Sequence, residues 1–353
     1  MKNEMKGSND SIGVNYLELC DATVGKEAKD AQNVAAGIRS VIKGETKEFL
    51  YDYPCHGPDG RHFFYLRSIR VAEKEPIRVV VSHEDITALI LAEEALRQRE
   101  RERDRLRHSL ELAKEIQQIL LPKDNPKIKG LEVAGKSVYC DETGGDYYDF
   151  LKLKENGNEK IGVILGDISG HGIPSALLMA TARAFIRQRS FLPGSLTEII
   201  TDINVLLCAD AMESNSFMTL FYAMIDTYTN SIKWIRAGHD PAIVYDPKSD
   251  NFEELVGPAG IPIGVVPDWH YEEDEKTGLE KDQVIVISTD GINETLNPQN
   301  KMYGKEPVLN IIRKNKNGTA EQILKAIIAD LNRFRKGRDF QDDVTLIVIK
   351  IME

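Results

Sequence analysis

The sequence predicts an α+β fold for most of the 353-residue chain, and two observations support this class. Short runs rich in β-branched residues follow one another with connections of a few residues, as between Ile225 and Ser231. Such spacing indicates antiparallel hairpins, because parallel strands need a long crossover. The predicted helices come in pairs and do not alternate singly with strands, which argues against a doubly wound parallel sheet.

Residues 1–88 are predicted to form a small module of their own. Strands are expected over 48–53, 61–71 and 77–82, where aromatic and β-branched residues concentrate. A turn over 54–60, rich in glycine and proline, joins the first two as a hairpin. This arrangement, with its exit through Asp85-Ile86-Thr87 into a helix, resembles the C-terminal half of a PAS sensor domain. The stretch before Glu48 is short, so the leading PAS strands are expected to be missing or very short. Whether this module binds a ligand is therefore left open, and dimerisation is another possible role for it.

Residues 89–125 are predicted to form a helical linker, since no proline or glycine occurs between Ile86 and Leu121. A heptad frame places apolar side chains at its two core positions: Ala92, Leu106, Ala113 and Leu120 at one, and Leu89, Leu96 and Leu110 at the other. Arg99 and Arg103 also fall at core positions. The middle of the helix is therefore either a solvated face or a loosely held coiled coil. Pro122 and Pro126 end the helix and mark the start of a third part, residues 126–353.

In this third part the apolar periodicity predicts further elements in a defined order. Strands are expected over 131–139, 147–153, 161–167, 217–226, 231–236, 242–245, 283–288 and 344–351. Helices are expected over 173–188, 196–208 and 320–334.

Four short acidic motifs lie where these strands begin or end. They span residues 144–149, 166–172, 288–291 and 341–345. A single Asp-Gly is usually a turn, so turns are the alternative to a functional site. A sheet that gathers several carboxylates at its strand ends usually needs a cation, because like charges repel. Ligands that are all oxygen suit Mg²⁺ or Mn²⁺ better than zinc.

The four motifs, in this order, resemble the metal-dependent protein phosphatase (PPM) family, in its SpoIIE/RsbU-like branch. Further matching pieces are residues 237–241, 260–264, 293–295 and 303–304. The resemblance covers roughly residues 129 to 353 and implies a PPM-type β-sandwich flanked by helices. It also implies a two-metal centre, with two Mn²⁺ or Mg²⁺ ions held by Asp146, Asp167, Asp290, Asp342 and the backbone carbonyl of Ile168. Water activated by the two metals would hydrolyse phosphoserine or phosphothreonine on a protein.

Three further residues have roles that the sequence leaves open. Asp343 is expected to point away from Asp342 if the last strand has begun there, and it is the less favoured ligand. His171 either protonates the leaving seryl oxygen or holds its loop by hydrogen bonds, and the structural role is favoured. His239 has the same two readings, with the structural one again favoured.

The composition of the chain bears on its partners and its location in the cell. The net charge is −11, and from residue 129 onward there are 24 Lys and Arg against 34 Asp and Glu, which disfavours nucleic acid as a partner. No apolar run has the length of a membrane span, and the start lacks a signal-peptide core. The four scattered cysteines indicate reduced thiols, so a cytoplasmic protein is expected.

The family resemblance also implies partners. The substrate would be a phosphorylated STAS-type anti-sigma-factor antagonist in a bacterial partner-switching pathway of the stress-response kind. The linker helix and the PAS-like module would form a homodimer and respond to an upstream regulatory protein. The alternative is a non-catalytic pseudophosphatase that acts as a signalling scaffold. A third reading is an enzyme that stays silent until a partner orders the linker.

Overall fold

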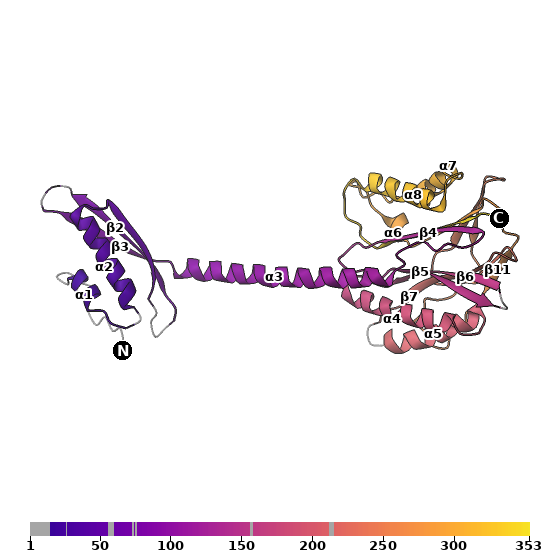
Figure 1. The fold of residues 1–353 in the computed structure, drawn as a ribbon, viewed down its shortest axis with the longest axis horizontal. Coiled ribbons are helices and arrows are strands. Elements are labelled where there is room, and N and C mark those ends of the chain that lie inside the picture. The colour runs from indigo at the N-terminus through magenta and orange to yellow at the C-terminus, as the bar shows by residue number, and fades with distance from the viewer. Residues whose placement is uncertain are drawn as a thin grey trace. The chain divides into compact units, whose positions relative to one another are not determined.

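The structure is a computed structural model that describes residues 15–25, 27–55, 60–72, 74, 76–155, 158–211 and 215–353. The first ten residues and the centre of the predicted hairpin turn, residues 56–59, lie outside this range. The chain divides into two compact units, residues 1–106 and 107–353. The division falls within helix α3 (Thr87–Leu120), labelled in Figure 1.

The first unit packs two helices, α1 (Tyr16–Ala22) and α2 (Ala28–Lys43), beside a three-stranded sheet. The strands β1 (Glu48–Pro54), β2 (Phe63–Ala72) and β3 (Arg78–Asp85) are antiparallel and pair in sequence order. All three predicted strands are thus confirmed. Apolar side chains of α2, such as Val34 and Ile38, meet Leu66 of β2 in a small core.

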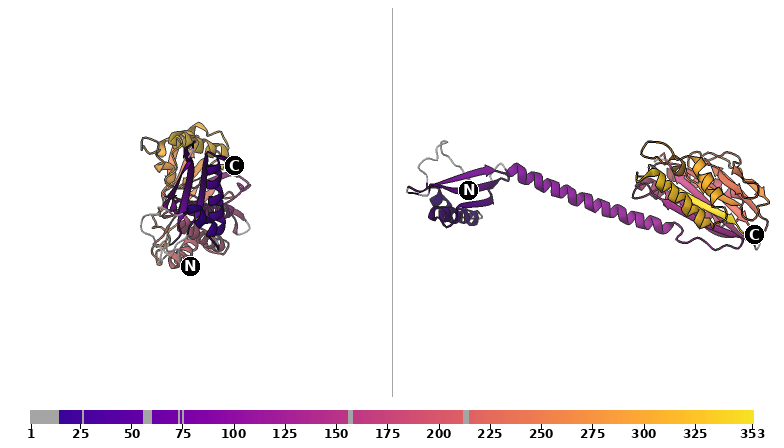
Figure 2. Two further views of the ribbon diagram at one scale, coloured as in Figure 1. Left: turned by 90° about the vertical axis from the view of Figure 1, so that its left-hand side faces the viewer. Right: turned by 90° about the horizontal axis from the view of Figure 1, so that it is seen from above.

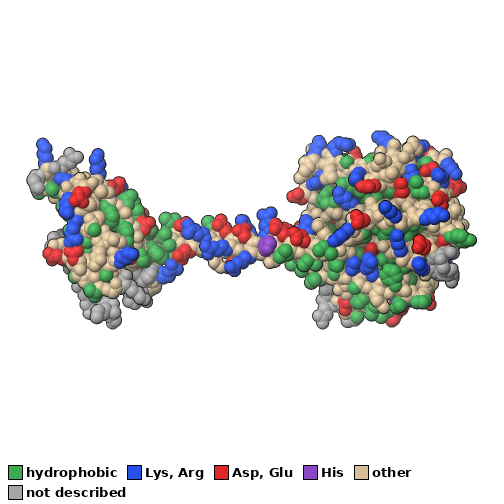
Figure 3. Space-filling view, in the orientation of Figure 1, with side chains coloured by type: hydrophobic (Ala, Val, Ile, Leu, Met, Phe, Trp, Pro, Cys, Tyr) green, Lys and Arg blue, Asp and Glu red, His purple; other side chains and the backbone are tan. Residues whose placement is uncertain are grey.

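Helix α3 is continuous over 34 residues, which confirms the predicted helix. Figure 3 shows Lys, Arg, Asp and Glu side chains covering its middle part. Gln117 is its one buried residue. Among the described residues, no helix is both long enough and apolar enough to cross a membrane.

The second unit contains two five-stranded sheets in which every strand pair is antiparallel. The first sheet has the order β10 (Asn251–Leu255), β9 (Ala242–Asp246), β12 (Val284–Ser288), β13 (Val344–Ile351) and β4 (Leu131–Val138). The second has the order β11 (Asp274–Thr277), β8 (Ser231–Ala237), β7 (Met218–Asp226), β6 (Asn158–Ile168) and β5 (Tyr147–Glu155). Every strand predicted for this part is present, whereas β10 and β11 were not predicted.

The two sheets pack face to face, with helices on both outer faces (Figures 1 and 2). The central core joins side chains such as Val163 and Phe221 of one sheet to Ile285 and Ile347 of the other. Helices α4 (Ile173–Ser190) and α5 (Leu196–Ala211) cover the sheet of β5–β8, and α7 (Lys305–Lys314) and α8 (Ala320–Arg335) cover the other. The expected β-sandwich flanked by helices is therefore present.

The antiparallel pairing brings the four acidic motifs to one end of the sandwich. Tyr147 at the start of β5 pairs with Gly166 near the end of β6. Ser288 at the end of β12 pairs with Leu346 near the start of β13. Strand ends that meet in this way place the motifs together although nearly two hundred residues separate the first from the last.

Candidate active site

Asp146 lies fully buried just before β5 and is the innermost carboxylate of the group. Its Oδ2 accepts a hydrogen bond of 3.1 Å from the hydroxyl of Thr289, while its Oδ1 has no partner among the described residues. Burial, followed by the nearby charges of Asp167 and Asp343, raises the pKa of Asp146 well above that of an ordinary carboxyl. An unpartnered buried oxygen of this kind calls for a ligand.

Asp343 is also buried, but both of its oxygens are used by backbone N–H groups. Oδ1 accepts from the amide of Cys140 at 2.8 Å, and Oδ2 accepts from the amide of Gly145 at 2.7 Å. The loop that carries Asp146 is thereby tied to the start of β13. These contacts favour a supporting role for Asp343.

Asp167, Asp290 and Asp342 complete the acidic group. Burial, together with Asp342 and Asp290 among its neighbours, raises the pKa of Asp167 to about 7. Burial and then Asp342 raise the pKa of Asp290, and burial is also the main cause of the raised pKa of Asp342. All four expected carboxylates are thus held close enough to oppose one another's ionisation.

The glycines of the motifs allow close backbone packing at this point. A Cβ atom on Gly145 would lie 2.8 Å from the carbonyl oxygen of Ile168, and one on Gly291 would lie 2.0 Å from the carbonyl oxygen of Asp343. Neither position can hold a larger residue without moving the backbone. The Ile168 carbonyl is therefore directly beside the loop that carries Asp146.

The arrangement is a gathered acidic cluster and not a closed cage. Among the described parts of the chain, no group of three or more His, Cys, Asp or Glu side chains is already arranged to hold a metal ion. The donor chemistry nevertheless fits a hard divalent cation, because its charge would offset the repulsion between these carboxylates and would satisfy the unpartnered oxygen of the buried Asp146.

Asp149 belongs to the first acidic motif but not to the cluster. Its Oδ2 accepts from the hydroxyl of Tyr147 at 2.7 Å and pairs with the guanidinium of Arg187 on α4. This buried network joins β5 to α4.

His171 lies in the loop before α4 and is largely exposed. Its Nδ1 is 2.6 Å from Oδ2 of Asp141, in a segment close to the first motif. A carboxylate at this distance fixes the orientation of the ring and leaves Nε2 as the nitrogen that faces other partners. The pair is compatible with either expected role of His171.

His239 is buried, and its Nδ1 is 2.8 Å from the hydroxyl of Thr219. Burial lowers its pKa to about 4, so the ring is neutral at neutral pH. Both features favour the structural role.

Three residues that support the site were not predicted from the sequence as site residues. Gln117 at the end of α3 donates from Nε2 to the carbonyl of Gly144 at 2.5 Å and accepts from the Gly144 amide at 3.1 Å. Thr289 holds Asp146, and Asp141 holds His171. Thr289 was visible as part of its motif, but nothing in the sequence marks Gln117 or Asp141.

The double sheet with flanking helices is the fold of PP2C-type phosphatases. The SiaA PP2C domain of Pseudomonas aeruginosa matches with a TM-score of 0.59 and 22% identity, over 70% of this chain and 98% of that domain. A structure of the PP2C domain and part of the regulatory domain of SpoIIE from Bacillus subtilis matches with a TM-score of 0.53 and 14% identity, over 93% of this chain and 99% of that one.

The family described as stage II sporulation protein E (SpoIIE) matches residues 157–352, more than half of the chain, so the chain belongs to this family. It is homologous to two phosphoserine phosphatases of Bacillus subtilis (strain 168). RsbU is 28% identical over 247 residues, or 69% of this chain and 70% of RsbU. RsbP is 24% identical over 252 residues, or 69% of this chain and 58% of RsbP.

Proposed function

We propose that this chain is a divalent-metal-dependent protein serine/threonine phosphatase that removes phosphate from a regulatory protein. The observation that carries the proposal is the group of mutually repelling carboxylates around the fully buried Asp146, within a phosphatase fold. A cluster of this kind is unfavourable by itself and is explained by the cation it would bind.

The proposed ligands are the carboxylates Asp146, Asp167, Asp290 and Asp342 and the Ile168 carbonyl. Two bound Mn²⁺ or Mg²⁺ ions would supply an acidified water and positive charge to offset the charge that develops at phosphorus. Thr289 orients Asp146, and Asp343 fixes the backbone that leads into it. His171, oriented by Asp141, would hold or deliver a proton at Nε2 toward the leaving seryl oxygen.

For the substrate we propose a phosphorylated STAS-type anti-sigma-factor antagonist in a bacterial partner-switching pathway. Similarity to RsbU and RsbP, both named phosphoserine phosphatases, supports a phosphoseryl substrate. The cytoplasm is the proposed location, in keeping with the dispersed cysteines.

We further propose that the chain is a homodimer through α3 and the PAS-like module, under the control of an upstream protein. Leu89, Leu96 and Leu106, all at predicted heptad core positions, are 66%, 57% and 61% exposed in the single chain. A second α3 would cover them. Because the far end of the same helix holds Gly144 through Gln117, a change in α3 would reach the acidic cluster.

The proposal is tested by hydrolysis of a phosphoseryl protein and of an aryl phosphate, with and without Mn²⁺. We expect activity only with the divalent ion, and a loss of at least about a hundredfold in Asp290→Asn, which removes one charge that the site needs. Hydrolysis without metal, or unchanged activity of Asp290→Asn, would contradict the proposed mechanism. Mn²⁺ binding without hydrolysis of any phosphoprotein would favour the scaffold alternative.

A further inference from the structure

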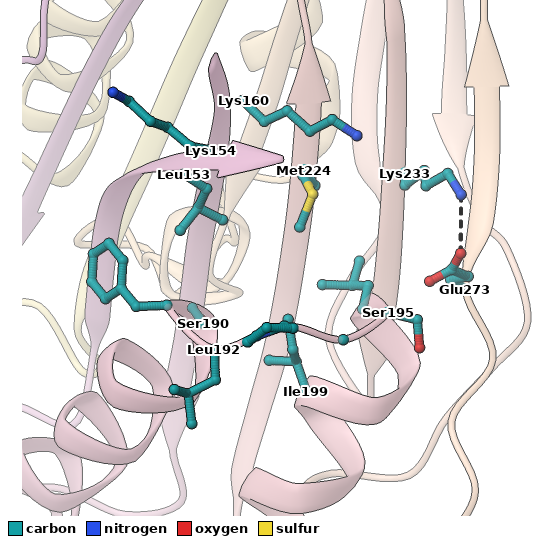
Figure 4. Close-up of a pocket in the computed structure, with 14 residues that line it drawn as sticks. Leu153, Lys154, Lys160, Ser190, Leu192, Ser195, Ile199, Met224, Lys233 and Glu273 are labelled. Carbon is teal, nitrogen blue, oxygen red and sulfur yellow. Dashed lines mark hydrogen bonds and ion pairs between the residues drawn. The ribbon is translucent and has the colours of Figure 1, made fainter. Parts of the chain in front are cut away.

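A cavity lies on the helix-covered face of the sheet of β5–β8, beneath the connection that joins α4 to α5 (Figure 4). Its volume is about 640 Å³. Cavities of roughly 300–1,000 Å³ are typical of sites for small molecules. The connection, residues 191–195, forms one wall, and the sheet forms the floor.

Apolar and cationic side chains alternate across the floor of this cavity. Leu153 of β5 is directly opposite Lys160 of β6, and Met224 of β7 is directly opposite Lys233 of β8. Figure 4 shows the Lys160 side chain extending past Met224, and the Lys233 side chain pointing toward Glu273. Lys160 on β6 and Lys233 on β8 flank β7, so their strands are about 10 Å apart, and both long side chains border the same cavity as the apolar floor.

The side of the cavity that faces the sheet is formed by the start of α5 and the connection, and it is largely apolar. Leu196 and Ile199 at the start of α5 are buried and face the cavity, while Phe191 and Leu192 in the connection are 57% and 48% exposed. Large apolar side chains that remain exposed beside a cavity supply area that a ligand can cover.

The charge of the lining is positive although this part of the chain is acidic. Lys154, Lys160 and Lys233 line the cavity together with one carboxylate, Glu273. Lys233 lies 3.2 Å from Glu273 and 3.9 Å from Glu275, and Lys160 lies 3.4 Å from Asp226, so carboxylates hold both ammonium groups in place. Held cations above an apolar floor select for an anion that has an apolar portion.

We propose that this cavity binds a small amphiphilic anion. A carboxylate or phosphate head group would lie at Lys160 and Lys233, and an apolar chain would cover Met224, Leu196 and Ile199. Lys160 and Asp167 are seven residues apart on β6, which places the cavity about 23 Å from the acidic cluster. The ligand is therefore neither the phosphoseryl group nor a competitor for it.

Calorimetric titration of the full chain with decanoate and with decyl phosphate tests this proposal and distinguishes the two head groups. We expect saturable binding of at least one of them at one site per chain. Lys160→Gln and Lys233→Gln should each weaken it by roughly tenfold, which is about 1.4 kcal/mol. Lys325→Gln is the matched control, since Lys325 is an exposed lysine in an ion pair on α8. Acetate, which lacks the chain, and decanol, which lacks the charge, should bind far more weakly.

Several results would overturn the proposal. These are the absence of saturable binding by both anions, equal binding of decanol or acetate, and unchanged affinity in both cavity variants. Lys233 is the more exposed of the two lysines, so Lys233→Gln decides the matter if Lys160→Gln fails to fold. The titration is repeated in Asp290→Asn, where binding should be unchanged. Because it measures binding alone, its result is independent of whether the chain hydrolyses phosphoserine.

Discussion

Asp146 and Asp343 are buried carboxylates beside the same glycine-rich loop, but their surroundings differ. Asp343 accepts backbone hydrogen bonds on both oxygens, whereas one oxygen of Asp146 has no partner among the described residues. A carboxylate whose oxygens already accept hydrogen bonds, such as Asp343, is stabilised little by a nearby cation. Asp146 is buried, is repelled by Asp167 and has one oxygen without a partner, so a cation would stabilise it most. The difference in hydrogen bonding therefore distinguishes Asp146, the proposed ligand, from Asp343, the residue that supports it.

Asp167 makes the metal-free protein sensitive to pH. Its pKa is about 7 in the folded chain and near 3.9 in an unfolded one, so between these values the folded chain keeps a proton that the unfolded chain releases. The free energy of unfolding should therefore fall as pH rises from 5 to 8, by an amount on the order of a few kcal/mol for this group. Urea unfolding in the presence of a chelator measures the change.

The control for this prediction is Asp167→Asn, which removes the titrating group. The pKa of the buried His239 is lowered to about 4, and this works in the opposite direction, so only the difference between the two proteins isolates Asp167. The variant should lose less stability than the wild type between pH 5 and 8. An identical pH dependence in both proteins would contradict the effect assigned to Asp167. At pH 8, Mn²⁺ should restore stability to the wild type only.

At the level of secondary structure, sequence patterns predicted the apolar strands, including the edge strands β4 and β5, and missed two short polar edge strands. β12 and β13 are apolar runs and were predicted nearly to the residue. β10 and β11 each lie at one sheet edge and are short and largely polar or charged, so no apolar alternation marks them. Helix α7 was missed although Val308 and Ile312 are its buried face. Its proline, Pro307, lies in the first turn, where a helix tolerates it.

The contact of α3 with the Gly144 loop was beyond prediction for a different reason. Gln117 is a polar residue in a polar helix, and its partner lies 27 residues further along the chain. The contact exists only because the second unit folds around the end of α3. Local sequence places the acidic motifs at strand ends. The contacts that hold them, such as that of Gln117 with Gly144, form only in the tertiary structure.

Gln117→Ala should reduce turnover and weaken metal binding, because it removes both hydrogen bonds that hold Gly144 two residues before Asp146. Loss of a supporting contact of this kind typically costs about 10–100-fold in metal affinity or activity. The measurement is a Mn²⁺ titration of initial rates. Gln118→Ala is the matched control, since Gln118 is the exposed neighbour on the same helix. Equal rates for the two variants would show that α3 does not support the site.

At the scale of the whole molecule, α3 is the element that both compact units share. If its exposed leucines form a dimer interface, replacing Leu89, Leu96 and Leu106 by lysine should convert a dimer to a monomer, because buried like charges oppose pairing of the helices. Sedimentation velocity over a range of concentrations measures this change. Leu91→Lys is the control, since Leu91 is exposed but lies outside the heptad core. A monomeric wild-type chain would contradict the proposed dimer.

If the strand-end carboxylates form a two-metal centre, the metal-free chain should bind Mn²⁺ in a calorimetric titration. We expect a stoichiometry of about two ions per chain, and markedly weaker binding in both Asp290→Asn and Asp146→Asn. The asparagine variants should remain folded without metal, because each removes one of the repelling charges. Absence of Mn²⁺ binding by the folded wild type, or binding that both substitutions leave unchanged, would contradict the two-metal centre.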